Sequence, residues 1–106
     1  MKKIAALLGI LALTVSCKTA SSGPSKDFLK DAYKNKFYIG TAMSLPQIDG
    51  TDVKSDEIIK KQFSSIVAEN CMKSMFIQPQ EGKFFFGDAD KFVEFGEKNI
   101  MFIIGH

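Results

Sequence analysis

The chain has 106 residues, a length that accommodates one small domain. All 14 of its basic side chains are Lys, and 12 carboxylates oppose them. Once Lys2 and Lys3 are set aside as part of a leader, basic and acidic side chains are equal in number, which argues against a nucleic-acid-binding protein. The lack of Arg also argues against bidentate phosphate recognition.

The first 16 residues have the pattern of a secretory signal. A basic start precedes the apolar run at residues 4–15, which is too short to cross a bilayer because a spanning helix needs about 20 residues. Cys17 follows a small residue, an arrangement that resembles the lipobox of bacterial lipoproteins. We therefore expect residues 1–16 to be a lipoprotein signal peptide and Cys17 to carry the lipid; an ordinary cleaved signal is the alternative.

This leader defines the expected organisation and location of the protein. Residues 17–26 comprise the lipidated Cys and a flexible tether rich in Gly, Pro and Ser, and residues 27–106 form the folded part. We expect an exported protein that is anchored to a bacterial membrane and faces the periplasm or the cell surface.

Cys71 has no intrachain disulfide partner if Cys17 is lipidated. A lone Cys in an exported protein can pair between chains or act as a nucleophile. A small buried apolar side chain is the commoner role, and we favour it for Cys71. The sequence has no Cys-x-x-Cys pair and a single His, which argues against a structural zinc site.

Helical and β-prone segments alternate from residue 27 onward. Residues 27–34 carry apolar side chains at helical spacing and predict a short opening helix. Residues 37–43 are β-prone, and a turn-rich loop with Pro46 and residues 49–52 follows. Ser55 is a suitable N-cap for the next helix. The side chains expected to be buried in that helix are Ile58, Ile59 and Phe63.

The second half of the chain repeats this alternation. Residues 64–68 predict a strand and residues 73–83 a loop. Residues 88–98 predict an amphipathic helix that ends at Asn99. Its buried face is expected to consist of Ala89, Phe92, Val93 and Phe95. The continuous apolar run at residues 100–104 predicts a strand that is buried on both faces.

Strands and helices in this order predict an α/β fold with a parallel sheet. Three strands are too few to close the sheet into a barrel, and this part of the chain is too short to cover both faces of the sheet. We therefore do not expect residues 27–106 to fold independently. The carboxyl ends of parallel strands meet at one edge. Glu69 and Asn70 follow one strand there and His106 follows the last, which predicts a binding face.

Four sequence blocks carry a resemblance to a known family. In chain order they are Ala-Glu-Asn-Cys-Met-Lys at 68–73, Gln-Pro-Gln-Glu-Gly-Lys-Phe at 78–84, Asp-Ala-Asp at 88–90 and Gly-His at 105–106. Together they resemble glycoside hydrolase family 10, whose members are chiefly endo-1,4-β-xylanases. Residues 37–42 also look like the family's first strand, and residues 59–63 look like the helix before its second strand.

This resemblance implies both a fold and an activity. Residues 27–106 would be about three βα units from the N-terminal portion of a (β/α)8 TIM barrel, truncated before the rest of the catalytic domain. The substrate would be xylan or xylo-oligosaccharide, whose internal β-1,4 bonds are hydrolysed with retention. No cofactor and no metal are implied.

The resemblance also implies roles for four residues. Glu69, Asn70 and Lys73 match the positions that line the glycone side of the family's cleft, and His106 matches a His that contacts the sugar at the cleavage point. Xylose presents neutral hydroxyls, which these side chains can satisfy as donors and acceptors. Such contacts can strengthen as the sugar ring distorts toward an oxocarbenium-like transition state.

Simpler roles remain open for the same residues. Glu69 and Lys73 are four apart and form a solvated ion pair in the alternative interpretation. Asn70 is alternatively a turn residue, and His106 an exposed terminal residue. Within the matched pattern we favour the sugar-binding roles.

The run Phe84-Phe85-Phe86 is either a sugar-stacking platform or part of the core, and we expect core packing against the following helix. Two positions depart from the family pattern: Cys71 stands where the family usually has Glu, and Ile104 where it usually has Arg or a similar residue. Both departures indicate a divergent branch.

No catalytic residue is assigned within the chain. Retaining hydrolysis needs two carboxylates about 5–5.5 Å apart. The resemblance places both on Glu residues of later strands, so Glu69 is not assigned to either role, and the chain alone is expected to be inactive. The alternatives to a xylanase fragment are a non-catalytic glycan-binding surface lipoprotein and a complete small structural lipoprotein.

Overall fold

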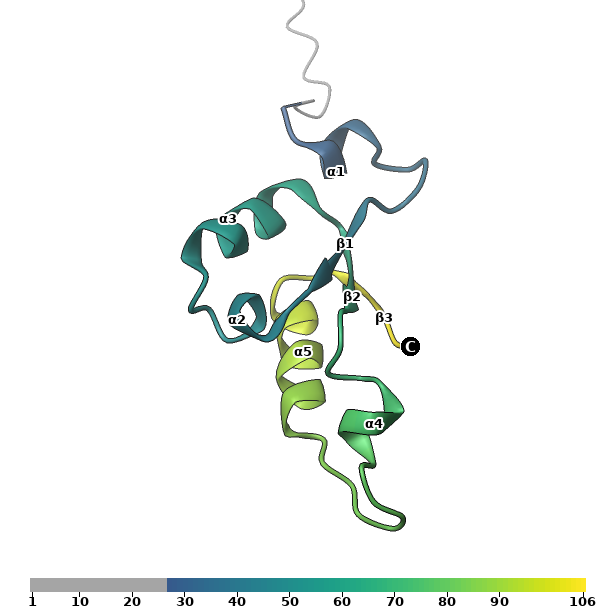
Figure 1. Ribbon diagram of the computed structural model, residues 1–106. Coiled ribbons are helices and arrows are strands. Elements are labelled where there is room, and N and C mark those ends of the chain that lie inside the picture. The colour runs from purple at the N-terminus through teal and green to yellow at the C-terminus, as the bar shows by residue number, and fades with distance from the viewer. Residues whose placement is uncertain (1–26) are drawn as a thin grey trace, which may run out of the picture.

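The computed structural model describes residues 27–106, so Cys17 and the predicted signal lie outside the described residues. Figure 1 shows the elements of this range. In chain order they are α1 (Leu29–Ala32), β1 (Gly40–Met43), α2 (Leu45–Ile48), α3 (Val53–Gln62), β2 (Ser65–Ala68), α4 (Ser74–Ile77), α5 (Gly87–Lys98) and β3 (Phe102–Ile104). No helix in the described range is long and apolar enough to cross a membrane.

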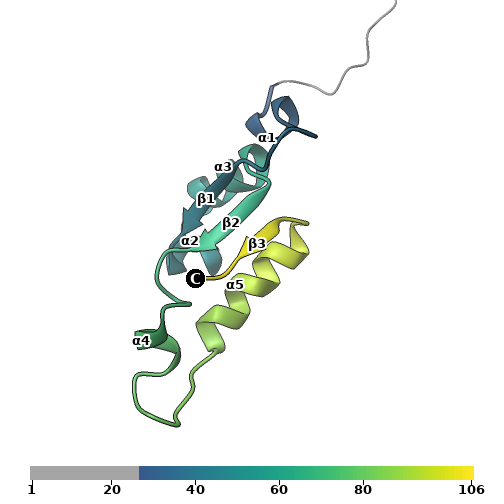
Figure 2. The ribbon, with the colours of Figure 1, turned by 90° about the vertical axis from the view of Figure 1, so that its right-hand side faces the viewer.

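The strands form one parallel sheet in the order β1-β2-β3, which confirms the predicted fold class. Met43 pairs with Ala68, and Val67 pairs with Ile104. In Figure 1, α2, α3 and α5 lie on the same side of the strands. In Figure 2 the strands point toward α4, so α4 and the loop that follows it lie beyond their carboxyl ends.

The core lies between the sheet and these helices. Its buried residues are Met43, Ile48, Ile59, Ile66, Ala68, Cys71, Phe92 and Met101. Burial of Cys71 confirms its predicted role as a small core side chain. On α5, Ala89 and Phe92 are buried as predicted, while Val93 and Phe95 are partly buried against the core.

Two short helices were not expected, and α1 and all of the strands are shorter than expected. α2 begins where Ser44 and Gln47 form a capping box, so Pro46 stands in the first turn of a helix rather than in a loop. α4 occupies part of the predicted loop at residues 73–83. α1 has four residues, and β1 begins at Gly40 instead of residue 37.

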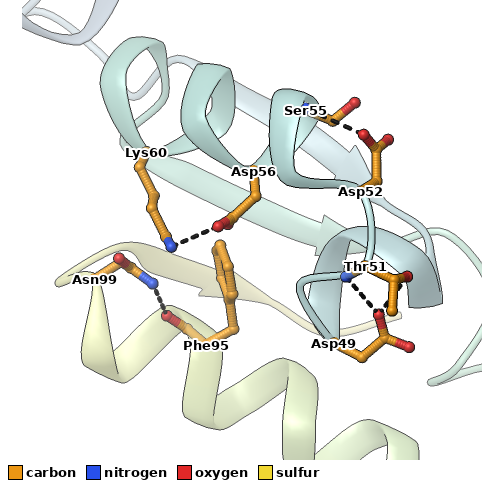
Figure 3. Close-up of polar contacts among 8 residues, drawn as sticks. All are labelled: Asp49, Thr51, Asp52, Ser55, Asp56, Lys60, Phe95 and Asn99. Carbon is orange, nitrogen blue, oxygen red and sulfur yellow. Dashed lines mark hydrogen bonds and ion pairs between the residues drawn. The ribbon is translucent and has the colours of Figure 1, made fainter.

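Helix α3 begins earlier than predicted. Its N-cap is Asp52 rather than Ser55, because the Asp52 carboxylate accepts a hydrogen bond from the backbone N–H of Ser55 at 3.2 Å (Figure 3). Ile59 is buried as predicted, and Phe63 packs partly buried against the core. Ile58 is exposed, since adjacent helical residues point about 100° apart and only one of the pair faces the sheet.

The cap makes stability depend on pH. Hydrogen bonds from Ser55 hold the pKa of Asp52 below its ordinary value of 3.8. The stabilisation that the charged Asp52 carboxylate gives to the folded protein is therefore fully present above pH 3.8 and is lost as the pH falls through the lowered pKa. Asp52→Asn keeps an acceptor without a charge, so its unfolding free energy should fall less between pH 7 and pH 3 than that of the unsubstituted protein. If denaturant titrations give both proteins the same loss of unfolding free energy between pH 7 and pH 3, the charge of Asp52 does not stabilise the helix.

The end of α5 is fixed by side chains. Asn99 ends the helix as predicted, and its amide donates to the Phe95 carbonyl at 2.8 Å. Beside it, the Lys60 ammonium of α3 donates to Asp56 at 2.6 Å and lies 5.5 Å from the centre of the Phe95 ring (Figure 3). Lys60 thus joins α3 to α5.

Strand β3 is not buried on both faces within the described residues. Ile103 packs toward the core, but Phe102 is 52% exposed and Ile104 45% exposed. The prediction failed because the helices that pack on the sheet, α2, α3 and α5, lie on one side of it. On the opposite face, the Phe102 ring stacks on Tyr38 with centroids 4.8 Å apart.

Gly96 allows α5 to approach the sheet. A Cβ at this position would lie 2.5 Å from Ile103 Cγ1 and 3.2 Å from Ile66 Cδ1. We expect Gly96→Val to lower the free energy of unfolding by about 1–3 kcal/mol through overpacking. Gly87→Val on the same helix is the matched control, because a Cβ there meets nothing within 4 Å. Equal effects of both substitutions in denaturant titrations would refute the close approach.

Candidate functional site

Polar residues gather at the carboxyl edge of the sheet. Ser44 directly follows β1, Glu69 and Asn70 follow β2, and Gly105 and His106 follow β3. Because the strands are parallel, these positions lie at the same edge, as the sequence predicts. The register places Glu69 and His106 at the same level, each two residues beyond the paired Val67 and Ile104.

Asn70 and Lys73 are held together by two hydrogen bonds. The Lys73 ammonium donates to Asn70 Oδ1 at 2.9 Å, and the Lys73 backbone N–H donates to the Asn70 carbonyl at 2.9 Å. Asn70 is thus a turn residue as well as a candidate ligand-binding one. An ammonium group has three donors and an amide NH2 has two, so the pair can still donate to the hydroxyls of a ligand.

Glu69 and His106 do not join this pair. The Glu69 side chain is exposed, and its backbone N–H donates to the Met43 carbonyl at 2.9 Å, which extends the β1–β2 pairing by one step. The ion pairs found in the described residues join Lys60 to Asp56 and Lys91 to Asp88, so the alternative Glu69–Lys73 ion pair is not formed. His106 is exposed.

A cavity of about 480 Å³ lies beside the Asn70–Lys73 pair. It is lined by Met43, Ser44, Leu45, Asn70, Cys71, Phe76, Phe85, Gly87 and Asp88. Asn70 is therefore the one predicted sugar-contacting residue in this lining. Ser44, Phe76 and Asp88 were not predicted to line a site, and the Ser-x-x-Gln capping box is the sequence signal for Ser44. Phe85 belongs to the run for which sugar stacking was the less favoured alternative to core packing.

The three consecutive Phe residues are not part of the core, contrary to the prediction. Phe84, Phe85 and Phe86 are each half or more exposed. Phe84 and Phe86 stack on each other with centroids 5.7 Å apart, and Phe85 faces the cavity. They precede α5 rather than cover it, because the segment is tied back to α4 by the bond from the Phe85 N–H to the Ile77 carbonyl at 2.8 Å.

Cys71 is poorly suited to nucleophilic chemistry. Burial raises the pKa of its thiol, and the nearby Asp88 carboxylate raises it further. We expect iodoacetamide to modify Cys71 at pH 8 about tenfold or more slowly than it modifies the unfolded chain. Asp88→Asn should increase the native rate because it lowers the pKa. A native rate equal to the unfolded rate would show that the thiol is accessible and ionised.

The described residues contain no group of three or more His, Cys, Asp or Glu side chains that could hold a metal ion. The groups that the site does offer are hydrogen-bonding amide, ammonium, hydroxyl and carboxylate groups beside exposed aromatic rings. Such a mixture suits a neutral polyhydroxylated ligand, which presents hydroxyls at its edge and C–H groups on its faces.

A parallel sheet with helices on one side and polar residues at its carboxyl edge is the arrangement that an α/β barrel repeats around its axis. A sequence model described as Glycosyl hydrolase family 10 matches residues 28–106. The chain therefore belongs to glycosyl hydrolase family 10, which confirms the resemblance seen in the sequence.

Characterised relatives and solved structures agree with this assignment. Endo-1,4-beta-xylanase A of Xylanibacter ruminicola is 37% identical over 99 residues, which cover 93% of this chain and 26% of that protein. Endo-beta-1,4-xylanase Xyn10C of Cellvibrio japonicus is 31% identical over 106 residues, which cover 96% of this chain and 18% of that protein. A psychrophilic family 10 endo-beta-1,4-xylanase superimposes with a TM-score of 0.69 at 38% identity, covering 74% of this chain and 24% of that structure.

These neighbours are TIM barrels, and the sheet with its helices corresponds to an N-terminal portion of that fold. Xylanase B of Clostridium stercorarium F9 gives a TM-score of 0.67 at 37% identity, with 22% of that structure covered. The chain thus spans about a quarter or less of these proteins.

Proposed function

We propose that the whole protein to which this chain belongs is an endo-1,4-β-xylanase that hydrolyses internal β-1,4-xylosidic bonds of xylan with retention. The hydrogen-bonded Asn70–Lys73 pair at the carboxyl end of β2 is the observation that carries this proposal. It presents oriented donors to sugar hydroxyls at the barrel edge where active sites form. Family membership and the names of the relatives support the same substrate.

Within that enzyme, residues 27–106 would hold the substrate rather than cleave it. Asn70 and Lys73, with Glu69, contact the glycone side, and His106 contacts the sugar at the cleavage point. A retaining mechanism uses two carboxylates about 5–5.5 Å apart. Neither is assigned to this chain, so residues 27–106 alone should not hydrolyse xylan.

The stereochemistry of the product tests this function. The whole protein should release xylo-oligosaccharides from xylan, and proton NMR during xylohexaose cleavage should show the β-anomer first. Xylohexaose incubated without protein is the negative control. A whole protein that binds xylohexaose without cleaving it would be a glycan-binding protein instead.

We further propose that the protein is exported and anchored to a bacterial membrane through a lipid on Cys17. The basic start, the short apolar run and the Cys17 position support this proposal. A bacterial host that expresses the protein should incorporate labelled palmitate into it, and Cys17→Ser should abolish the label. Incorporation that persists in the Cys17→Ser protein would place the lipid elsewhere.

A further inference from the structure

Basic side chains gather at the amino edge of the sheet, at the opposite end from the candidate site. The lysines that come shortly before the three strands are Lys34 and Lys36 before β1, Lys60 and Lys61 before β2, and Lys98 before β3. Because the strands are parallel, these positions lie at the same edge. In Figure 2, α1 lies at the end of the strands opposite to α4.

Most of these ammonium groups have no carboxylate partner. The ion pairs in the described residues join Lys60 to Asp56 and Lys91 to Asp88. The exposed lysines of the amino edge that take no part in such a pair are Lys34, Lys36, Lys61 and Lys98. The acidic residues close to them in the chain are fewer: Asp27, Asp31 and Glu97. The amino edge therefore carries a net positive charge.

A hollow of about 330 Å³ opens at this edge beside α1. Its lining consists of Lys30, Lys34, Asn35, Lys36, Phe37, Tyr38 and Ser64. The Lys30 ammonium donates to the Lys60 carbonyl at 2.6 Å, which ties α1 to the end of α3. Lys binds phosphate as a point charge, so the lack of Arg does not oppose phosphate contacts at this hollow.

Exposed apolar side chains stand among these lysines. Phe37 is 58% exposed, Tyr38 64% and Ile100 95%. Ile100 also has a φ of 54°, a left-handed conformation that is costly for a β-branched residue. Cations interleaved with aromatic and aliphatic groups suit the surface of a bilayer, where the cations meet lipid phosphates and the apolar groups enter the headgroup layer.

The chain enters the described residues at this same edge. Asp27 directly precedes α1, and the Leu29 N–H in that helix donates to Gln62 Oε1 of α3 at 2.9 Å. Cys17, the proposed site of the lipid, stands ten positions before Asp27. Ten residues reach at most about 36 Å, so a lipid on Cys17 would keep the amino edge close to the bilayer.

We propose that the amino edge of the sheet docks on an anionic phospholipid surface, with Lys34 and Lys36 contacting lipid phosphates and Phe37 entering the headgroup layer. This inference rests on the proposed anchoring through Cys17 and is independent of the proposed xylanase activity. In this orientation the carboxyl edge, with Asn70 and Lys73, points away from the bilayer toward a polysaccharide in solution.

Vesicle co-sedimentation of the whole protein, expressed from residue 18 onward so that it carries no lipid, tests this surface. At an ionic strength of about 0.1 M it should bind vesicles of phosphatidylglycerol and phosphatidylcholine in equal amounts, and it should bind pure phosphatidylcholine much more weakly. Lys34→Gln combined with Lys36→Gln should weaken binding about 10- to 30-fold, since each Lys near an anionic bilayer contributes about fivefold.

The matched control is Lys54→Gln combined with Lys83→Gln. It removes the same charge at exposed positions, in the first turn of α3 and in the loop after α4, which lie away from the amino edge. Its binding should stay within about twofold of the unsubstituted protein. Circular dichroism melting of both double variants identifies any loss that is due to unfolding.

Two outcomes would overturn the proposal. One is an equal loss of binding in the two double variants, which would show that the total charge matters and the amino edge does not. The other is equal binding of the unsubstituted protein to both kinds of vesicle. Because this assay uses protein without lipid, its result does not depend on palmitate labelling or on xylan cleavage.

Discussion

Asn70→Ala in the whole protein should lower kcat/KM on xylohexaose about 10- to 100-fold, because a hydrogen bond to a sugar hydroxyl and the partner of Lys73 are lost together. The effect should appear on short and long substrates alike, since the proposed contact lies next to the cleavage point. Initial rates over a range of substrate concentrations measure it.

The control for this experiment is Gln80→Ala. Gln80 also carries an amide, but its side chain is exposed in the loop after α4 and does not line the cavity. Lys73→Met should reproduce part of the Asn70→Ala loss. If Asn70→Ala and Gln80→Ala have the same kcat/KM as the unsubstituted protein, the carboxyl end of β2 does not hold the substrate.

Phe92→Ala should lower the free energy of unfolding by about 3–5 kcal/mol, the largest stability effect expected in this chain. Phe92 is fully buried between α5 and the sheet, so truncation leaves a cavity that the rigid neighbours can fill only in part. Denaturant titration of the whole protein measures the change.

Glu97→Ala is the matched control for Phe92→Ala, because Glu97 lies on the same helix with its side chain exposed. Its effect should stay within about 0.5 kcal/mol. A loss below about 1 kcal/mol for Phe92→Ala would mean that α5 does not pack against the sheet as described.

The regular part of the fold was predictable from local pattern. The apolar spacing on α5 and the Asn99 stop identified a helix with few competing interpretations, and both are confirmed. Choosing between Asp52 and Ser55 as the N-cap was harder, since both residue types cap well. The Asp52 N–H donates to the Pro46 carbonyl at 2.9 Å, which holds Asp52 at the start of α3. This bond joins residues on the two sides of the preceding loop, so it could not be predicted from local pattern.

Burial was less predictable than secondary structure. A continuous apolar run such as residues 100–104 does not say which faces have neighbours, and the exposure of Phe102 and Ile104 depends on where the helices gather. The run of three Phe residues has neither a helical nor a strand period that could assign a face. Its exposure follows from the tie between Phe85 and Ile77, a contact made across the loop.

The candidate site was predictable in its type and less so in its extent. Asn70 and Lys73 were both expected to contact sugar, but the hydrogen bond between them was not predicted, because Glu69 and Lys73 were the side chains considered as a pair. The cavity was not predicted either, because its lining comes from β1, α4 and α5 as well as from the segment after β2. Only the packing of these elements shows that Phe76 and Phe85 face the same space.

A crystal structure of the whole protein with xylotriose would show whether the Asn70–Lys73 pair holds the substrate. We expect a sugar whose hydroxyl oxygens lie about 2.7–3.2 Å from both the Asn70 amide and the Lys73 ammonium at the carboxyl end of β2. A sugar bound in the cleft with neither Asn70 nor Lys73 within hydrogen-bond distance would contradict it.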